Sequence, residues 1–188
     1  MPQTFSLTDH FLIAMPQLQD PNFFHGVTYI CEHNENGAMG ILINRPLDLS
    51  EAEVFDQLGL QIPNPPHREL QPVYVGGPVQ SERGFIIHHP VGHWDTSLRV
   101  TRDIAVTSSR DILEALAQGQ GPQRYLIALG YAGWGPGQLE SELAQNAWIN
   151  VPADDTVIFN TPPTQRWEVA AALGGIDLAR LSGDVGHA

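Results

Sequence analysis

The sequence predicts a single-domain α+β fold with a mixed or mainly antiparallel sheet. Short apolar runs rich in β-branched residues recur along the chain, some as hairpin pairs and others alternating with amphipathic segments. The length of 188 residues suffices for one well-buried core, and a hydrophobic fraction of 42% is ordinary for a globular protein. These observations indicate roughly nine or ten strands and three or four helices. We expect residues 182–188 to form a frayed tail.

Two apolar runs around a short polar loop predict a β-hairpin. Val27–His33 and Ala38–Asn44 flank Asn34-Glu35-Asn36-Gly37, and an Asn-Gly pair at the end of such a loop is a strong hairpin signal. Further apolar or β-branched runs predict strands at residues 11–15, 72–75, 84–88, 97–100, 103–106, 125–129, 148–151 and 156–159.

Four segments carry helix signals. Ser50, with a glutamate three residues later, forms a capping box that begins a helix ending near Gly59. Residues 111–118 form a second, amphipathic helix. A third helix opens at Pro136, whose missing N–H is harmless in a first turn, and a last long helix follows Thr161.

The charge balance restricts the chemistry that the chain can perform. It has 9 basic against 21 acidic residues, for a formal net charge of −12, and every basic residue is an arginine. The absence of lysine excludes Schiff-base chemistry and a phosphate-binding lysine. The negative charge opposes direct nucleic-acid binding, because the release of counterions from phosphates requires a basic face.

Composition also bears on the compartment. No apolar run approaches the roughly 18 residues of a membrane-spanning helix. The N-terminus lacks the basic and long apolar regions of a signal peptide. Cys31 is the only cysteine, which excludes an intrachain disulfide. We therefore expect a cytoplasmic protein with no membrane association.

The stretch 126–143 is the best candidate for a functional site. A buried, uncharged strand leads into the glycine-rich turn Gly130–Gly137, which contains Tyr131, Gly133 and Trp134, and a helix follows. One hypothesis is that backbone N–H groups at the helix start bind an anion beside the two aromatic rings. The alternative is that the glycines form a tight corner and the rings fill the core. The glycine spacing matches neither a P-loop nor a dinucleotide fingerprint, so we predict no cofactor.

Other positions complete this candidate site. Gly76 and Gly77 allow either close approach to a ligand or a simple strand-ending turn. Arg45 stands at a strand end, where it would clamp an anionic group or pair with an interior carboxylate. Glu140 lies on the helix after the turn. Glu140 and Glu142 are two residues apart and do not face each other, which disfavours an acid–base carboxylate pair.

Histidines and the cysteine raise two further hypotheses. His88, His89 and His93 are close in sequence, but neighbours on a strand point to opposite faces, so we predict a solvated loop and no metal site. Cys31 and His33 are predicted to share a strand face about 7 Å apart. They form either a nucleophile pair or, as we prefer, a small buried apolar side chain beside an unrelated histidine.

Motifs spread along nearly the whole chain point to one family. They lie within residues 11–16, 32–40, 44–46, 76–79, 130–134, 138–143 and 146–148. In this order they resemble the AlgH family of bacterial proteins, also called YqgE, and the closing Gly186-His187-Ala188 resembles its Pseudomonas-type branch. The resemblance implies one α+β domain whose bifurcated sheet partly closes into a barrel packed by helices. It implies no agreed activity or cofactor, although some members are labelled transcriptional regulators with a genetic link to alginate production.

We therefore expect a non-catalytic binding or regulatory protein. Its acidic surface would meet a protein partner, or its glycine-turn cleft would bind a small anionic ligand such as a nucleotide. The alternative is an enzyme that uses Arg45, Tyr131, Trp134 and Glu140 around that cleft. A third function, direct DNA binding, agrees with the regulator label but not with the charge.

Overall fold

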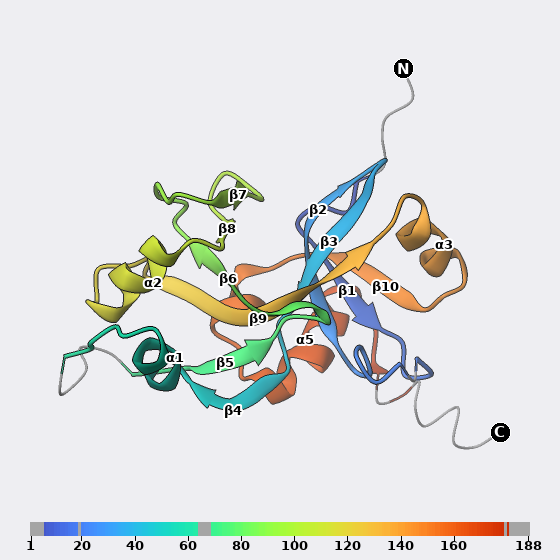
Figure 1. Ribbon diagram of the computed structural model, residues 1–188. Helices are drawn as coiled ribbons and strands as arrows, with labels where there is room; N and C mark the ends of the chain where they lie inside the picture. The colour runs from blue at the N-terminus through green and yellow to red at the C-terminus, as the bar shows by residue number, and fades with distance from the viewer. Residues whose placement is uncertain (1–5, 19, 64–68, 179, 181–188) are drawn as a thin grey trace.

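Ten strands form one curled sheet that closes into a half-barrel, and helices pack against its faces (Figure 1). The computed structural model describes residues 6–18, 20–63, 69–178 and 180. The predicted α+β class with a mixed, mainly antiparallel sheet is confirmed. The described residues form five α-helices rather than three or four. The tail at residues 182–188 lies outside the described residues.

The elements follow one another in an alternating order. The strands are β1 (His10–Ala14), β2 (Val27–Asn34), β3 (Gly37–Leu42), β4 (Pro46–Ser50), β5 (Pro72–Val75), β6 (Val79–His89), β7 (Ser97–Arg99), β8 (Ala105–Thr107), β9 (Arg124–Trp134) and β10 (Trp148–Pro152). The helices are α1 (Glu51–Gln57), α2 (Arg110–Ala117), α3 (Gln138–Ala144), α4 (Asp155–Phe159) and α5 (Arg166–Leu173). Within the described ranges, no helix has the length and apolarity needed to span a membrane.

Strand β9 is shared by two arms of the sheet. One arm consists of β10, β1, β2 and β3, and the other contains β6, β8 and β7. The strand order is β10-β1-β2-β3-β9-β6-β8-β7. The second half of β9, Ala132 to Trp134, pairs with β3. The first half pairs antiparallel with β6 at one edge and parallel with β5 at the other. The sheet therefore forks along β9, which confirms the bifurcation that the family resemblance implies.

The connection from β5 to β6 must cross β9. Ala128 of β9 pairs with Tyr74 of β5 and also with Phe85 of β6. A strand residue has one neighbour at each edge, so β5 and β6 flank β9 on opposite sides. The three residues between them, 76–78, carry the chain from one edge of β9 to the other.

Glycine makes this crossing sterically feasible. A Cβ added to Gly76 would lie 2.2 Å from the Gly130 carbonyl oxygen, and one on Gly77 would lie 2.1 Å from the Tyr131 carbonyl carbon. A Cβ on Gly130 would lie 2.3 Å from the Gly77 carbonyl oxygen, and Gly130 also has a φ of +79°. No side chain fits at such distances. The glycine motifs near residues 76 and 130 are therefore two halves of one backbone contact.

Three apolar clusters hold the elements together. The largest lies inside the half-barrel and includes residues of α4 and α5. A second cluster joins β1, β2, β9 and β10 to α3 and contains both Trp134 and Trp148. A third lies between α1, α2 and the first half of β9. Each arm of the fork thus has its own core on one face, and the large core spans both.

Residues 155–159 form helix α4, so the strand predicted at 156–159 is wrong. The run Thr-Val-Ile-Phe has high β propensity, and a short apolar run does not distinguish a strand from a buried helix. The Asp154 carboxylate decides the outcome, because it accepts a hydrogen bond from the Thr156 N–H at 2.8 Å and caps the helix.

Other boundaries also differ from the prediction. Strand β9 continues through Gly130 and Gly133, so the turn shrinks to residues 135–137 and α3 begins at Gln138 rather than at Pro136. Strand β4 is absent from the prediction. The long last helix is instead a 3₁₀ turn, Pro163–Gln165, followed by α5. Ser50 is confirmed as the N-cap of α1, since its side chain accepts from the Glu53 N–H.

The crossing predicts a position-specific sensitivity to alanine. Gly130→Ala should lower the free energy of unfolding by about 2–4 kcal/mol, because the new methyl group strikes backbone and the positive φ adds strain. Gly84→Ala is the matched control, since a Cβ on Gly84 meets nothing within 4 Å. Urea unfolding of both variants measures the difference. Equal stability of the two variants would contradict the crossing.

Candidate functional site

An open groove lies at the fork of the sheet, between the β2–β3 hairpin and the start of β6. It has a volume of about 820 Å³, within the range of small-molecule sites. Its lining residues lie mostly on the β2–β3 hairpin, β6 and β9, whose arrangement Figure 1 shows. The residues that line it are Glu32, Asn34, Asn36, Gly37, Ala38, Met39, Val79, Gln80, Arg83, Phe85, Ser108, Tyr131, Gly133 and Trp134.

A bulge in β6 opens the groove. Val79 pairs with Tyr131, but the next pair along the strand is Gly84 with Leu129. Four residues of β6 therefore stand opposite one residue of β9 and leave the ladder. Gln80 within this segment has a φ of +48°, a left-handed conformation that redirects the chain. The bulge lies directly after the crossing, since β6 begins at Val79 and its register with β9 shifts between Val79 and Gly84.

The floor of the groove is apolar. Phe85 belongs to the large core, and Met39 and Tyr131 pack against it. The Tyr131 ring meets the Phe85 ring edge to face, with 5.4 Å between centroids and 72° between planes. Gly133 leaves the floor open, because a Cβ there would meet only the Tyr131 ring, at 3.5 Å. Flat apolar surface is thus available beside an open backbone position.

The rim of the groove is polar and carries one charge of each sign at the described positions. Glu32 extends from β2, and Arg83 extends from the bulge of β6. The Arg83 guanidinium donates to Ser108 Oγ at 3.0 Å and to Gln80 Oε1 at 3.4 Å, and lies 5.7 Å from the centroid of the Phe85 ring. Its position is therefore fixed by neutral partners.

The structure brings three of the predicted site residues together. Tyr131, Gly133 and Trp134 all line the groove. Tyr131 and Gly133 lie on one face of β9, whereas the Trp134 indole is packed in the second cluster. Its Nε1–H donates to Glu142 at 3.1 Å, and the Trp148 indole donates to the same carboxylate oxygen at 3.0 Å. Trp134 therefore anchors α3 more than it faces a ligand.

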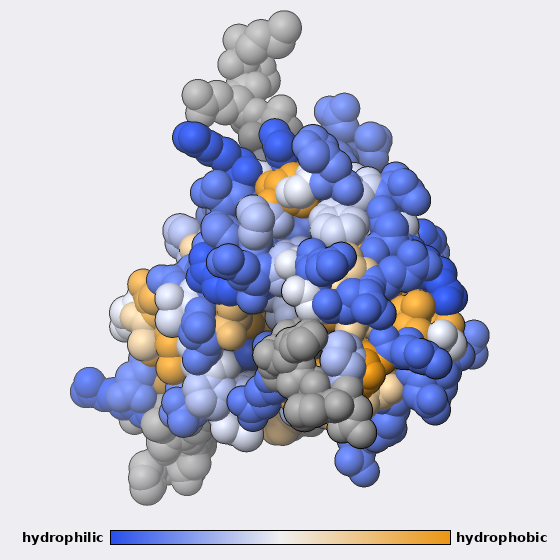
Figure 2. Space-filling view, turned by 90° about the vertical axis from the view of Figure 1, so that its left-hand side faces the viewer, coloured by the Kyte–Doolittle hydropathy of each residue, from blue (hydrophilic) through white to orange (hydrophobic). Residues whose placement is uncertain are grey.

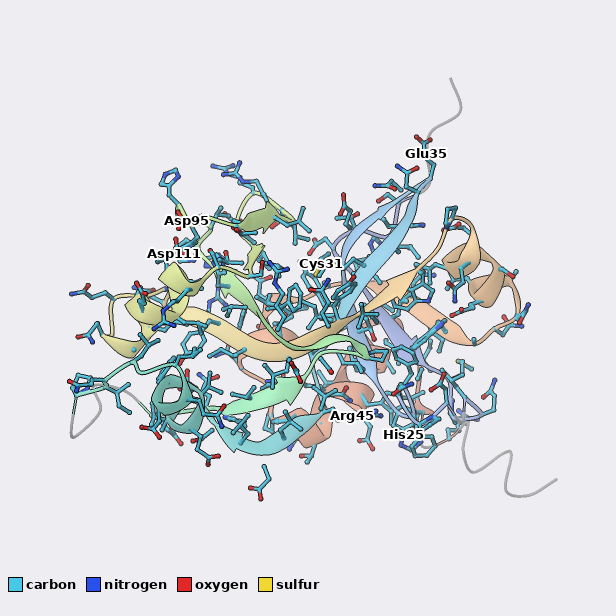
Figure 3. The ribbon with its side chains drawn as sticks, in the orientation of Figure 1. His25, Cys31, Glu35, Arg45, Asp95 and Asp111 are labelled. Carbon is cyan, nitrogen blue, oxygen red and sulfur yellow. The ribbon has the colours of Figure 1, made fainter. Side chains whose placement is uncertain are left out.

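Gly76, Gly77 and Arg45 lie outside the groove lining. The two glycines are occupied by the crossing. The Arg45 guanidinium donates to the backbone carbonyls of Pro21, Asn22 and Phe24, at 2.6–2.9 Å. Figure 3 shows Arg45 near His25 and far from the hairpin tip marked by Glu35. Arg45 therefore stabilises the loop before β2 and does not line the groove.

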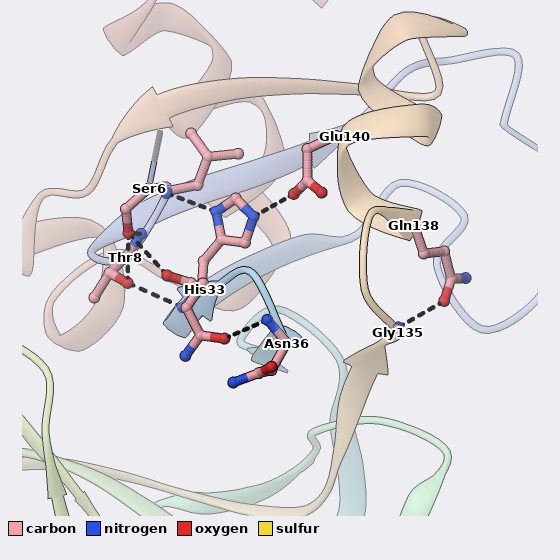
Figure 4. A network of polar contacts seen from close by, with 9 residues as sticks. Ser6, Thr8, His33, Asn36, Gly135, Gln138 and Glu140 are labelled. Carbon is pink, nitrogen blue, oxygen red and sulfur yellow. Dashed lines mark hydrogen bonds and ion pairs between the residues drawn. The ribbon is translucent and has the colours of Figure 1, made fainter. Parts of the chain in front are cut away.

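Glu140 also lies outside the lining, in a separate polar network (Figure 4). Nδ1 of buried His33 accepts from the Leu7 N–H at 2.9 Å, so the ring carries its proton on Nε2. Nε2 donates to the Glu140 carboxylate. This chain of bonds ties the N-terminal segment, β2 and α3 together, and it defines a structural role for Glu140.

Cys31 and His33 do not share a face, so that prediction is wrong. Ile30 pairs with Gly40 and Glu32 with Met39, which leaves Cys31 as the extra residue of a β-bulge. Cys31 enters the large core, whereas His33 faces Leu7 and α3. Burial raises the pKa of the Cys31 thiol, and the nearby Glu32 carboxylate raises it further. The preferred interpretation of Cys31 as a small buried apolar side chain agrees with this position.

The sequence predicts that the histidines near residue 88 lie in a solvated loop, and for His88 this prediction is wrong. His88 is fully buried, with Nδ1 against the Pro90 carbonyl at 2.9 Å and Nε2 against Thr107 Oγ1 at 2.7 Å. Burial lowers its pKa and favours the neutral ring. Among the described residues, no group of three or more His, Cys, Asp or Glu side chains is arranged to hold a metal ion.

Sequence reasoning missed Glu32, Met39, Arg83 and Phe85 as lining residues. The first two lie in a hairpin that was predicted correctly, but nothing local shows that the hairpin faces β6. Arg83 lies in a polar segment before an apolar strand, which is typical of an ordinary loop. The signal that would have found it is the pair of glycine motifs, had they been recognised as one crossing.

The fold and the groove define a single-domain α+β protein with a forked half-barrel sheet and an open cavity at the fork. A family model described as AlgH-like matches residues 11–179, and the chain belongs to this AlgH-like family. A UPF0301 protein of Nitrosococcus oceani is 57% identical over 180 residues, covering 96% of each chain. A UPF0301 protein of Thioalkalivibrio sulfidiphilus is 55% identical over 188 residues, the full length of both.

Solved structures agree with this assignment. The solution structure of the AlgH protein from Pseudomonas aeruginosa has a TM-score of 0.79 at 46% identity, covering 97% of each chain. A crystal structure from Corynebacterium diphtheriae has a TM-score of 0.68 at 20% identity, covering 90% of this chain and 87% of the other, and it shows the fold alone. The names of these relatives specify no reaction and no ligand.

The position of Cys31 predicts an unreactive thiol. In native protein at about pH 8, a disulfide reagent that reports on thiols should react with Cys31 far more slowly than in urea, because the thiolate form is disfavoured and the side chain is inaccessible. The comparison of native and denatured rates measures this. Rapid native reaction would show that the bulge exposes the sulfur.

Proposed function

We propose that the chain is a non-catalytic binding protein and that its ligand lies in the groove at the fork. The observation that carries the proposal is an apolar floor under a polar rim, in an open cavity of about 820 Å³. Small-molecule sites have this combination of apolar contact area and few oriented polar groups. Of the two partners that the sequence allows, a protein and a small molecule, we propose the small molecule.

The lining supports binding more than catalysis. Its described residues include no histidine or cysteine, and their ionisable side chains are Glu32, Arg83 and Tyr131. Nucleophilic catalysis needs a nucleophile within hydrogen-bond reach of a base, whereas the serine of the lining, Ser108, accepts from the Arg83 guanidinium. Three polar side chains of the lining, Asn34, Asn36 and Gln80, are amides, which orient ligands by hydrogen bonds.

Direct nucleic-acid binding is not part of the proposal. The formal net charge is −12, with 9 arginines and no lysine. Among the described residues, five of these arginines contact carbonyl or side-chain oxygens of the protein itself: Arg45, Arg83, Arg110, Arg124 and Arg166. The face in Figure 2 is largely hydrophilic with separate small apolar patches. A cytoplasmic location belongs to the proposal and rests on the single cysteine.

Filling the groove should weaken ligand binding without loss of stability. Gly133→Leu places a side chain over Tyr131, where a Cβ has room. A panel of nucleotides, sugar phosphates and small organic acids is titrated into labelled protein, and the amide signals of Tyr131 and Gly133 are followed by NMR. We expect at least one compound to shift these signals, and Gly133→Leu to weaken its binding by about tenfold or more.

Gly84→Leu is the matched control, because it adds the same side chain to the same sheet outside the groove lining. It should bind as the wild-type protein does, and both variants should keep a melting temperature within a few degrees of the wild type. A panel with no effect on these signals, or equal binding by Gly133→Leu, would overturn the proposal.

A further inference from the structure

Arg83 is a fixed cation that the described carboxylates leave unneutralised. Its guanidinium is held by Ser108 Oγ and Gln80 Oε1, and it forms no ion pair with a carboxylate among the described residues. A guanidinium has five N–H donors, and these two bonds use two of them. The remaining donors are available to an acceptor in the groove.

The charge of the chain makes this arrangement informative. With 21 acidic side chains against 9 basic ones, a carboxylate partner for an exposed arginine is easily supplied. Arg110 has one in Glu114, at 3.0 Å, and Arg124 has one in Asp155, at 3.8 Å. Arg83 has neutral partners instead, which orient the side chain and keep its charge available.

The apolar floor begins where the guanidinium ends. The Phe85 ring, 5.7 Å below the Arg83 guanidinium carbon, meets the Tyr131 ring edge to face. A ligand with an anionic end on Arg83 would therefore lay its body along these rings and Met39. Glu32 on the opposite wall repels a second anionic group there, so the anion belongs at the β6 side.

We propose that Arg83 anchors the carboxylate of a small organic acid whose flat apolar body lies on Phe85, Tyr131 and Met39. This inference rests on the proposed function and names the class of its ligand. Gln80 and Ser108 are positioning residues, because they act on the ligand through the guanidinium. The guanidinium fork matches the two oxygens of a carboxylate, which a neutral amide of the same shape does not reproduce.

Phenylacetate and phenylacetamide test the inference, because they share size and ring and differ in charge. Both are titrated into labelled protein, with the amide signals of Tyr131 and Gly133 as the readout. Phenylacetate should bind about tenfold more tightly than phenylacetamide. Arg83→Gln should reduce phenylacetate binding to the level of the amide and leave amide binding unchanged.

Arg102→Gln is the matched control, because it makes the same change of charge at an exposed turn position outside the lining. It should leave both affinities unchanged. Equal binding of the two probes, or an equal loss in Arg83→Gln and Arg102→Gln, would overturn the anchor while groove binding itself stands. No shift with either probe would also overturn the anchor, and the panel with Gly133→Leu then decides the proposed function separately.

Discussion

The backbone contact between Gly76-Gly77 and Gly130-Tyr131 is the constraint on which the rest of the structure depends. Two chain segments pass each other there at distances that exclude any side chain. The contact sends β5 and β6 to opposite edges of β9, so the second half of β9 is left to pair with β3. The fork, the bulge in β6 and the groove between the arms all follow from this one crossing.

Polar bonds at the periphery hold the arms that the crossing separates. The Glu142 carboxylate of α3 accepts hydrogen bonds from the indole N–H groups of Trp134 and Trp148. The Glu140 carboxylate accepts one from the His33 ring. On the other side, buried Arg166 donates to the backbone carbonyls of Thr161 and Ile43. Burial costs such groups solvation unless every donor finds an acceptor, so these bonds fix α3 and α5 in one position. The β2–β3 wall of the groove is therefore held from behind by both helices, through His33 of β2 and through Ile43 just after β3.

Local signals predicted most elements, but not the relation between them. The hairpin around Asn36-Gly37 and the helix after Ser50 carry turn and cap signals within a few residues, and the structure has both. The glycines at 130 and 133 predict a turn when considered locally, because the partner of Gly130 across the crossing, Gly77, is about fifty residues away in sequence. Since β9 stays extended, Tyr131 and Trp134 fall on opposite faces, and only Tyr131 contributes its ring to the floor.

Because the groove lies at the fork, binding of the proposed ligand would affect how the two arms of the sheet are arranged. Its walls come from the β2–β3 hairpin and from β6, which are joined within the sheet only through β9. The proposed ligand would contact both walls, and by linkage it would favour the separation of the walls at which it makes the most contacts. A ligand that contacts one wall alone would make the same contacts at every separation of the walls and would not shift the equilibrium between them. Met39 of β3 and Phe85 of β6 both belong to the floor of the groove. A flat ligand on this floor would therefore contact both arms of the sheet.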